Sequence, residues 1–104
     1  MSKVAVIAKL TAADGKRDEL QAALADVGMA NVAAEPGTLL YALNADTKDP
    51  NVLWFYELYE DGDALATHGG SEAMKEMGRT IAPFMAGRAE VHVLDPVAAK
   101  GLEL

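Results

Sequence analysis

Apolar and polar positions along the chain follow two periods, one typical of strands and one typical of helices. Four runs rich in β-branched, aromatic and other apolar residues predict strands, at residues 4–10, 38–45, 52–60 and 89–94. Between these runs apolar residues recur every three or four positions, which predicts helices at residues 16–34, 62–68 and 72–81. The stripe of the first helix includes Leu20, Leu24 and Val27. Proline and glycine end or interrupt the helices at Glu35-Pro36-Gly37 and Gly69-Gly70.

The order of these elements, β-α-β-β-α-β, predicts the fold class. It is the split β-α-β pattern of ferredoxin-like α+β domains, in which helices cover one face of a four-stranded antiparallel sheet. A chain of 104 residues suits one such domain, and we assign it to residues 1–97. Residues 98–104 remain as a C-terminal tail.

Both faces of the predicted strands are apolar, which a single layer of helices does not explain. In residues 52–60 one face carries Val52, Trp54, Tyr56 and Leu58, and the other carries Leu53, Phe55, Glu57 and Tyr59. An antiparallel sheet with one face in water would alternate apolar and polar residues. We therefore expect a homodimer whose two sheets pack face to face, as a dimeric α+β barrel.

Charge and composition restrict the partners and the compartment of the protein. The 16 acidic and 9 basic residues give a net charge of −7. No cluster of Lys and Arg offsets this charge, so we exclude nucleic acid as a partner and expect no membrane binding. The chain has no cysteine, which removes disulfides, thiolate metal sites and cysteine nucleophiles. The absence of cysteine and of signal-peptide features fits a cytoplasmic protein.

His68 is the strongest candidate for chemistry at neutral pH. It is the one mid-chain side chain that titrates there, and helical spacing places it on the same face as Ala64 and Leu65. An imidazole in that position can act as a general base. The alternative is a buried histidine that bonds to a carbonyl or a carboxylate. The adjacent Gly69-Gly70 favours a ligand site, because glycine leaves room beside the ring.

Aromatic and sulfur-containing side chains are the candidates for substrate binding. Trp54 and Tyr56 share one face of a strand and can line a flat slot for an aromatic ligand, and Tyr41 can contribute from the preceding strand. Met74 and Met77 share a helix face and can line an adaptable pocket. Plain core packing is the alternative for all five residues.

The remaining polar candidates indicate structural roles and no cofactor. Glu57 is a carboxylate on an apolar strand and needs a partner, so we expect it to support the structure or a neighbouring group. His92 and Glu90 share one face of the last strand, where we expect an exposed or interfacial pair. Two histidines so far apart predict no metal site, and no glycine-rich phosphate loop is present.

A set of residues spread along the chain resembles the antibiotic biosynthesis monooxygenase family. The spacing is E-P-G-x-x-x-Y, then D-x-x-D-P, then E-x-Y-x-D-x-x-A-x-x-x-H. The residues that carry it are Glu35-Pro36-Gly37, Tyr41, Asp46, Asp49-Pro50, Phe55, Glu57, Tyr59, Asp61, Ala64 and His68. The resemblance covers nearly the whole chain and implies a ferredoxin-like dimer with His68 in a pocket. Ala73 and Met74 stand where many family members have a second histidine and an aromatic residue.

The resemblance also implies an activity. Known activities in the family include cofactor-independent oxidation of quinols and polyketide phenols, while relatives degrade haem or isomerise a phosphorylated sugar. We expect a monooxygenase that oxidises a small phenol or hydroquinone with O₂, bound between sheet and helices against Trp54 and Tyr56, with His68 as base. The alternatives are an isomerase or lyase acting on a small carbonyl compound, and a binding module for an aromatic metabolite or haem. A phosphorylated substrate would depend on Lys75 or Arg79.

Overall fold

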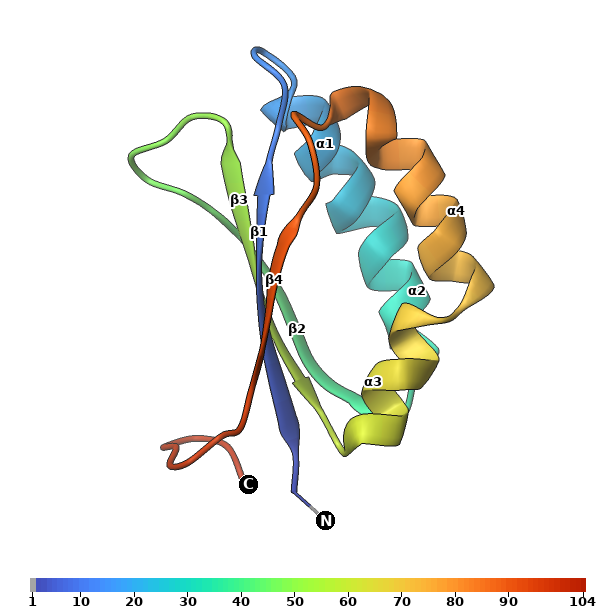
Figure 1. Ribbon diagram of the computed structural model, residues 1–104, viewed down its shortest axis with the longest axis vertical. Helices are drawn as coiled ribbons and strands as arrows, with labels where there is room; N and C mark the ends of the chain where they lie inside the picture. The colour runs from blue at the N-terminus through green and yellow to red at the C-terminus, as the bar shows by residue number, and fades with distance from the viewer. Residues whose placement is uncertain (1) are drawn as a thin grey trace.

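Helices on one side of a four-stranded sheet make up the structure, a computed structural model that describes residues 2–104 (Figure 1). The strands are β1 (Val4–Thr11), β2 (Thr38–Ala45), β3 (Val52–Tyr59) and β4 (Glu90–Leu94). The helices are α1 (Arg17–Ala23), η1 (Leu24–Gly28), α2 (Met29–Ala33), α3 (Gly62–Gly69), α4 (Glu72–Ile81) and η2 (Ala82–Phe84). The predicted elements are all present, with ends shifted by one residue at most.

The sheet has the topology expected from the order of the elements. Its strands pair antiparallel in the order β2-β3-β1-β4, which confirms the ferredoxin-like α+β class. Residues directly opposite one another across the strands point to the same face. On the helix side, one row across the sheet consists of Tyr41, Glu57, Val6 and Val93.

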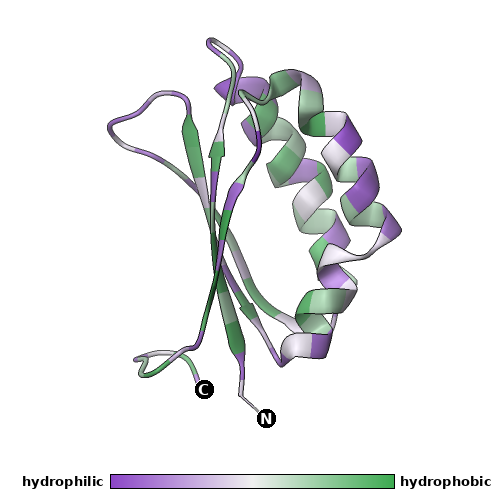
Figure 2. Cartoon of the chain, in the orientation of Figure 1, coloured by the Kyte–Doolittle hydropathy of each residue, from purple (hydrophilic) through white to green (hydrophobic). Residues whose placement is uncertain are grey.

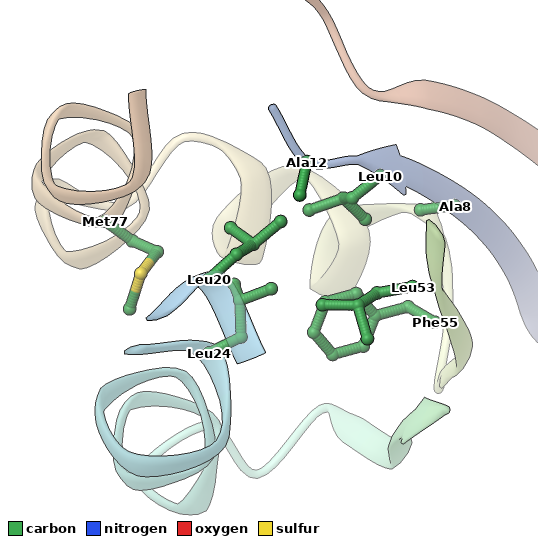
Figure 3. Close-up of a cluster of buried hydrophobic side chains, with 8 residues drawn as sticks. All are labelled: Ala8, Leu10, Ala12, Leu20, Leu24, Leu53, Phe55 and Met77. Atoms are coloured by element: carbon green, nitrogen blue, oxygen red, sulfur yellow. The ribbon is translucent and has the colours of Figure 1, made fainter. Parts of the chain in front are cut away.

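The core lies between the sheet and the helices α1, η1 and α4. Alternate residues of β1 and β3 point toward one face of these helices, because side chains alternate across a strand. Figure 3 shows the cluster, which consists of Ala8, Leu10, Ala12, Leu20, Leu24, Leu53, Phe55 and Met77. Burying one such leucine or phenylalanine stabilises the fold by about 1.5–3 kcal/mol. Figure 2 shows apolar residues concentrated along the strands, whereas the helices carry many polar residues.

The first predicted helix is continuous, but its middle turn η1 is a π-helix. A π turn holds more residues than an α turn. Positions four apart therefore stay on the sheet side, so that Leu20, Leu24 and Gly28 are buried. Val27, which an α-helical stripe would turn inward, is 50% exposed, and its predicted place in the stripe is wrong.

Two short helices carry the segment around His68, and side chains cap both of them. Asp61 Oδ1 accepts a hydrogen bond from the backbone N of Ala64 at 2.8 Å at the start of α3. Ser71 Oγ accepts from the backbone N of Met74 at 3.1 Å at the start of α4. The same hydroxyl donates to the carbonyl oxygen of His68 at 2.9 Å. The end of α3 is thereby tied to the start of α4.

No helix of residues 2–104 covers the other face of the sheet (Figure 1). Two rows of that face consist of Leu40, Leu58, Ala5 and Leu94, and of Ala42, Tyr56, Ile7 and His92. Tyr56 is 56% exposed there, and Leu40 and Leu94 are also exposed. In residues 2–104 no helix combines the length and the apolar character needed to cross a membrane.

Candidate functional site

A cavity of about 290 Å³ lies between the sheet and the helices. Most of its wall is apolar and comes from β1, β4, η1 and α4, with Leu10, Val91, Leu24, Met77 and Ile81 as examples. The polar side chains that line it are Asn31, Glu35, Tyr41, Glu57, His68 and Ser71. No lysine or arginine of the described chain contributes to the wall. Such a site suits a small ligand without negative charge.

The cavity is open along β4. Val91 and Val93 line it and belong to the helix side of the sheet, yet they are 56% and 62% exposed. The core helices instead pack against β1 and β3. A ligand therefore has an apolar approach beside the edge strand.

His68 is held by a carboxylate from a distant part of the chain. Its Nδ1 lies 2.8 Å from Oε1 of Glu35, and the same oxygen accepts a hydrogen bond from Thr38 Oγ1 at 2.8 Å. The imidazole is 5% exposed, so the pair is largely shielded from water. A carboxylate only accepts hydrogen bonds, so Nδ1 carries the ring proton and donates a hydrogen bond to Glu35. This assignment leaves the lone pair of the neutral ring on Nε2.

The Nε2 atom of His68 is open to the cavity. It has no hydrogen-bond partner within residues 2–104. In the same part of the chain no fully enclosed side-chain nitrogen or oxygen lacks a partner, so Nε2 is accessible. Tyr41 and Tyr59 flank the ring, each with its centroid 5.4 Å away. The free nitrogen can therefore accept a proton from a ligand in the cavity.

A second buried polar pair, Glu57 and Tyr59, lies on β3. Tyr59 donates its hydroxyl hydrogen to Oε1 of Glu57 at 2.5 Å. Burial raises the pKa of Glu57, and the Tyr59 hydrogen bond and the nearby His68 act against this rise. Burial also raises the pKa of Tyr41 and of Tyr59, with Glu57 adding to both shifts. Both phenols therefore stay protonated near neutral pH.

A family model described as "Antibiotic biosynthesis monooxygenase" matches residues 3–80 of the chain. The chain belongs to this family. The family resemblance expected from the residue spacing is confirmed, and it includes the segment that carries Glu35, Glu57 and His68.

Solved structures with the same fold include members named for this family. A Caulobacter crescentus protein, provisionally named as an antibiotic biosynthesis monooxygenase, is 33% identical with a TM-score of 0.86 over 93% of this chain and 92% of that chain. A Mycobacterium tuberculosis protein is 28% identical with a TM-score of 0.82, over 94% and 98% of the two chains. A Pseudomonas aeruginosa protein is 26% identical with a TM-score of 0.83, over 94% and 97%. No curated protein matches the chain significantly.

In this member of the antibiotic biosynthesis monooxygenase family, most of the residues proposed from sequence come together. His68, Tyr41, Glu57, Met74 and Met77 all line the cavity. Their roles in binding or catalysis stay predictions. Ala73 also lines the wall, and His68 is the one histidine of residues 2–104 that does so.

Trp54 and Tyr56 lie on the opposite face of the sheet, so the expected position of a substrate against them between sheet and helices is wrong. Residues 53, 55, 57 and 59 of β3 face the helices, and the alternation of the strand turns Trp54 and Tyr56 away. Trp54 Nε1 donates to Oδ2 of Asp46 at 2.8 Å, and Lys9 Nζ lies 5.7 Å from its ring centroid. Hydrogen bonds from the backbone of Asp49, from Trp54 and from the backbone of Lys48 lower the pKa of Asp46 to about 2.

Sequence reasoning missed Glu35 as the partner of His68. The two residues lie 33 positions apart, and Glu35 reads from sequence only as part of the helix-ending Glu35-Pro36-Gly37. One feature of the sequence could have indicated this role of Glu35: Thr38 lies three residues later, and its hydroxyl can orient the carboxylate by a hydrogen bond.

The other predicted polar pair lies away from the cavity. His92 Nε2 is 3.2 Å from Oε2 of Glu90, and both side chains are exposed on β4. Within residues 2–104, no three His, Cys, Asp or Glu side chains gather in a way that suits a metal ion.

Proposed function

We propose that this protein is a cofactor-independent monooxygenase that oxidises a small phenol or hydroquinone to a quinone with O₂. His68 acts as the general base in this proposal. The observation that carries it is a histidine whose Nδ1 is fixed by Glu35 and whose Nε2 opens into an apolar cavity. Membership of the antibiotic biosynthesis monooxygenase family supports the reaction class.

The first step is removal of the phenolic proton. The substrate hydroxyl donates to Nε2 of His68, and its ring lies among apolar side chains such as Met74 and Met77 with Tyr41 beside it. Transfer of the proton to His68 leaves a phenolate, and Glu35 stabilises the positive charge on the imidazole. General-base catalysis of this kind contributes roughly 10²–10⁴-fold to a rate.

The phenolate then reacts with O₂. It gives one electron to O₂, and the resulting phenoxyl radical and superoxide combine at a ring carbon to form a peroxide anion. This anion takes the proton back from His68, which leaves a hydroperoxide and a neutral imidazole. Loss of one water molecule leaves the quinone, so one phenol and one O₂ give one quinone and one water. A cavity that excludes water and holds the ring in place favours recombination over escape of superoxide.

The charges around the cavity weigh against a phosphorylated substrate and against haem as a ligand. Lys75 pairs with Glu72 at 3.3 Å and Arg79 with Glu76 at 2.8 Å, all four side chains are exposed, and none lines the cavity. A phosphorylated sugar or the propionates of haem would instead meet the carboxylate of Glu35.

The test is O₂ consumption by purified protein with a panel of phenols and hydroquinones. We expect uptake above autoxidation, with one quinone formed per O₂ and no effect of added catalase. The His68→Ala variant should lose roughly 10²-fold or more of this rate. His92→Ala is the matched control, because it removes an exposed histidine outside the cavity. A His68→Ala variant with full activity would remove His68 from the mechanism.

We also propose that the protein is a homodimer whose sheets pack through the uncovered face. Exposed Tyr56, Leu40 and Leu94 on that face support this, because apolar side chains gathered on a sheet favour burial against a partner. Face-to-face packing of two sheets leaves the cavity of each protomer on its own helix side.

A further inference from the structure

Glu57 is a buried acid that the proposed base step does not use. It is 8% exposed, and with His68 it makes up the buried polar or charged residues of the described chain. It sits on the helix side of β3 in one row with Tyr41 of β2 and Val6 of β1. It lines the same cavity as His68.

One oxygen of Glu57 is open to a ligand. Oε1 accepts the hydrogen bond of Tyr59, whereas Oε2 has no hydrogen-bond partner in residues 2–104. Fully enclosed side-chain oxygens without a partner do not occur in this part of the chain, so Oε2 is accessible from the cavity that Glu57 lines. The carboxyl is thus held by Tyr59 on one side and free on the other.

The chemistry of the proposed reaction requires a second proton-transferring group. Conversion of the substrate hydroperoxide to quinone removes a proton from the ring carbon and breaks the O–O bond. The departing oxygen must receive a proton at the same time. Otherwise it leaves as hydroxide, and an unsolvated anion in an apolar cavity has a high free energy. One imidazole cannot accept the carbon proton and donate to the departing oxygen in the same step.

We propose that Glu57 is this second group and that its free oxygen donates the proton that makes the departing oxygen water. The proposal rests on the proposed function. His68 takes the ring-carbon proton, its electron pair forms the new C=O bond as the O–O bond breaks, and the departing hydroxide takes the proton of Glu57. Proton return from His68 to Glu57 restores both groups, and the net products are one quinone and one water.

The surroundings of Glu57 favour its protonated form. The titratable groups that face it are Tyr59 on β3, Tyr41 on β2, His68 on α3 and Glu35 at the end of the first helical segment. Burial raises the pKa of Glu57, and Glu35 adds to the rise. Among residues 2–104 no lysine or arginine lines the cavity, so none is there to stabilise a carboxylate. An acid kept protonated beside a base is the arrangement that paired proton transfer needs.

The experiment compares O₂ uptake with quinone formation in wild type and in Glu57→Gln. Glutamine keeps the shape and can still accept from Tyr59, but it has no acidic proton. We expect O₂ uptake to continue while a substrate hydroperoxide accumulates, and quinone formation to fall by roughly 10²-fold. Glu76→Gln is the matched control, because Glu76 is an exposed acid on the outer side of α4.

The pH profile gives a second readout. The rate of quinone formation by wild type should fall as pH rises through the raised pKa of Glu57. This falling limb of the pH–rate profile should be absent in Glu57→Gln. In Tyr59→Phe the limb should move to higher pH, because the Tyr59 hydrogen bond lowers the pKa of Glu57. If Glu57→Gln fails to fold, the position of this limb in Tyr59→Phe decides the question.

The outcomes separate the two proposals. Wild type without O₂ uptake overturns both of them. Suppose instead that O₂ uptake depends on His68. If Glu57→Gln then forms as much quinone as it consumes O₂, or if the pH dependence of quinone formation is the same in Tyr59→Phe as in wild type, Glu57 is not the proton donor. The proposed monooxygenase activity is unaffected by that result.

Discussion

At the residue scale, the carboxylate of Glu35 determines which nitrogen of His68 is available as a base. It accepts from Nδ1 at 2.8 Å and is itself held by Thr38, so the imidazole keeps one orientation and one tautomer. A base whose partner is fixed in this way needs little reorganisation when it takes a proton. Removing the carboxylate should therefore affect the rate more than the affinity for substrate.

The first prediction concerns Glu35→Gln. The glutamine amide can donate to Nδ1, which moves the ring proton to Nε2 and removes the free lone pair from the cavity. We expect kcat to fall by roughly 10²-fold or more with a small change in KM. Nitrogen NMR of His68 should report the change of tautomer. Glu72→Gln, on the exposed side of α4, is the control, and an unchanged tautomer together with an unchanged kcat would contradict the role of Glu35.

The second prediction concerns stability and pH at Glu57. Its pKa is raised in the folded protein by burial, whereas the unfolded chain has an ordinary glutamate. As pH rises above the ordinary pKa, the unfolded chain loses its proton first. The free energy of unfolding should therefore fall with rising pH until the raised pKa is passed.

Urea unfolding at a series of pH values measures this effect. Wild type should lose stability relative to Glu57→Gln across that window, and Glu76→Gln should follow wild type. If the free energy of unfolding depends on pH in the same way in wild type and in Glu57→Gln, the Glu57 carboxyl does not have a raised pKa in the folded protein.

Individual residues show where sequence reasoning stops. The alternation of β3 was predictable, and so was its division into two sets of side chains. Both sets are apolar with one polar member or none, so the pattern did not reveal which set meets the helices. For that reason Trp54 and Tyr56 were expected at the wrong face, whereas helical spacing, the adjacent glycines and the family resemblance all pointed to His68 at a pocket.

At the element scale, the position of α3 depends on a close approach to the turn before β2. A Cβ on Gly37 would lie 2.6 Å from Cβ of Ala64, which is shorter than any ordinary contact. Glycine at this position lets α3 pack near the β2 strand and places His68 within reach of Glu35.

The third prediction follows from this contact. Gly37→Ala should destabilise the fold by about 1–3 kcal/mol and displace α3, with a loss of activity. In the double variant with Ala64→Gly the clash is gone, so the free energy of unfolding should recover in part, although glycine in a helix costs about 1 kcal/mol. Strictly additive effects in this double-mutant cycle, measured by urea unfolding, would show that the contact is absent.

Helix and strand ends were predictable because turn residues mark them, as Glu35-Pro36-Gly37 and Gly69-Gly70 do. The π turn of η1 was not, because it depends on how Leu24 and Gly28 fit against the sheet and α4. Cβ of an alanine at position 28 would meet Cε of Met77 at 4.0 Å, an ordinary contact, so the turn lies beside α4 at the cavity.

At the scale of the whole molecule, the order of elements and the apolar residues on both faces of the strands indicate one arrangement, a sheet with helices on one face only. The helices cover one face and form the cavity there, and the other face keeps exposed apolar side chains (Figure 1). The topology was predictable from the order of the strands and helices, because few arrangements satisfy short antiparallel connections. The cavity was not, because its existence depends on how completely side chains fill the space beside β4.

The fourth prediction tests the proposed dimer through Tyr56. This side chain lies opposite Ile7 of β1 on the uncovered face and is 56% exposed. In a two-fold interface each substitution occurs twice, so Tyr56→Asp would bury two carboxylates without partners, which strongly disfavours association. Sedimentation should give the mass of two chains for wild type and of one folded chain for Tyr56→Asp. Val27→Asp is the matched control, since Val27 is 50% exposed on the helix side, and it should stay dimeric. A monomeric wild type, or a Tyr56→Asp variant that remains dimeric, would rule out this face as the interface.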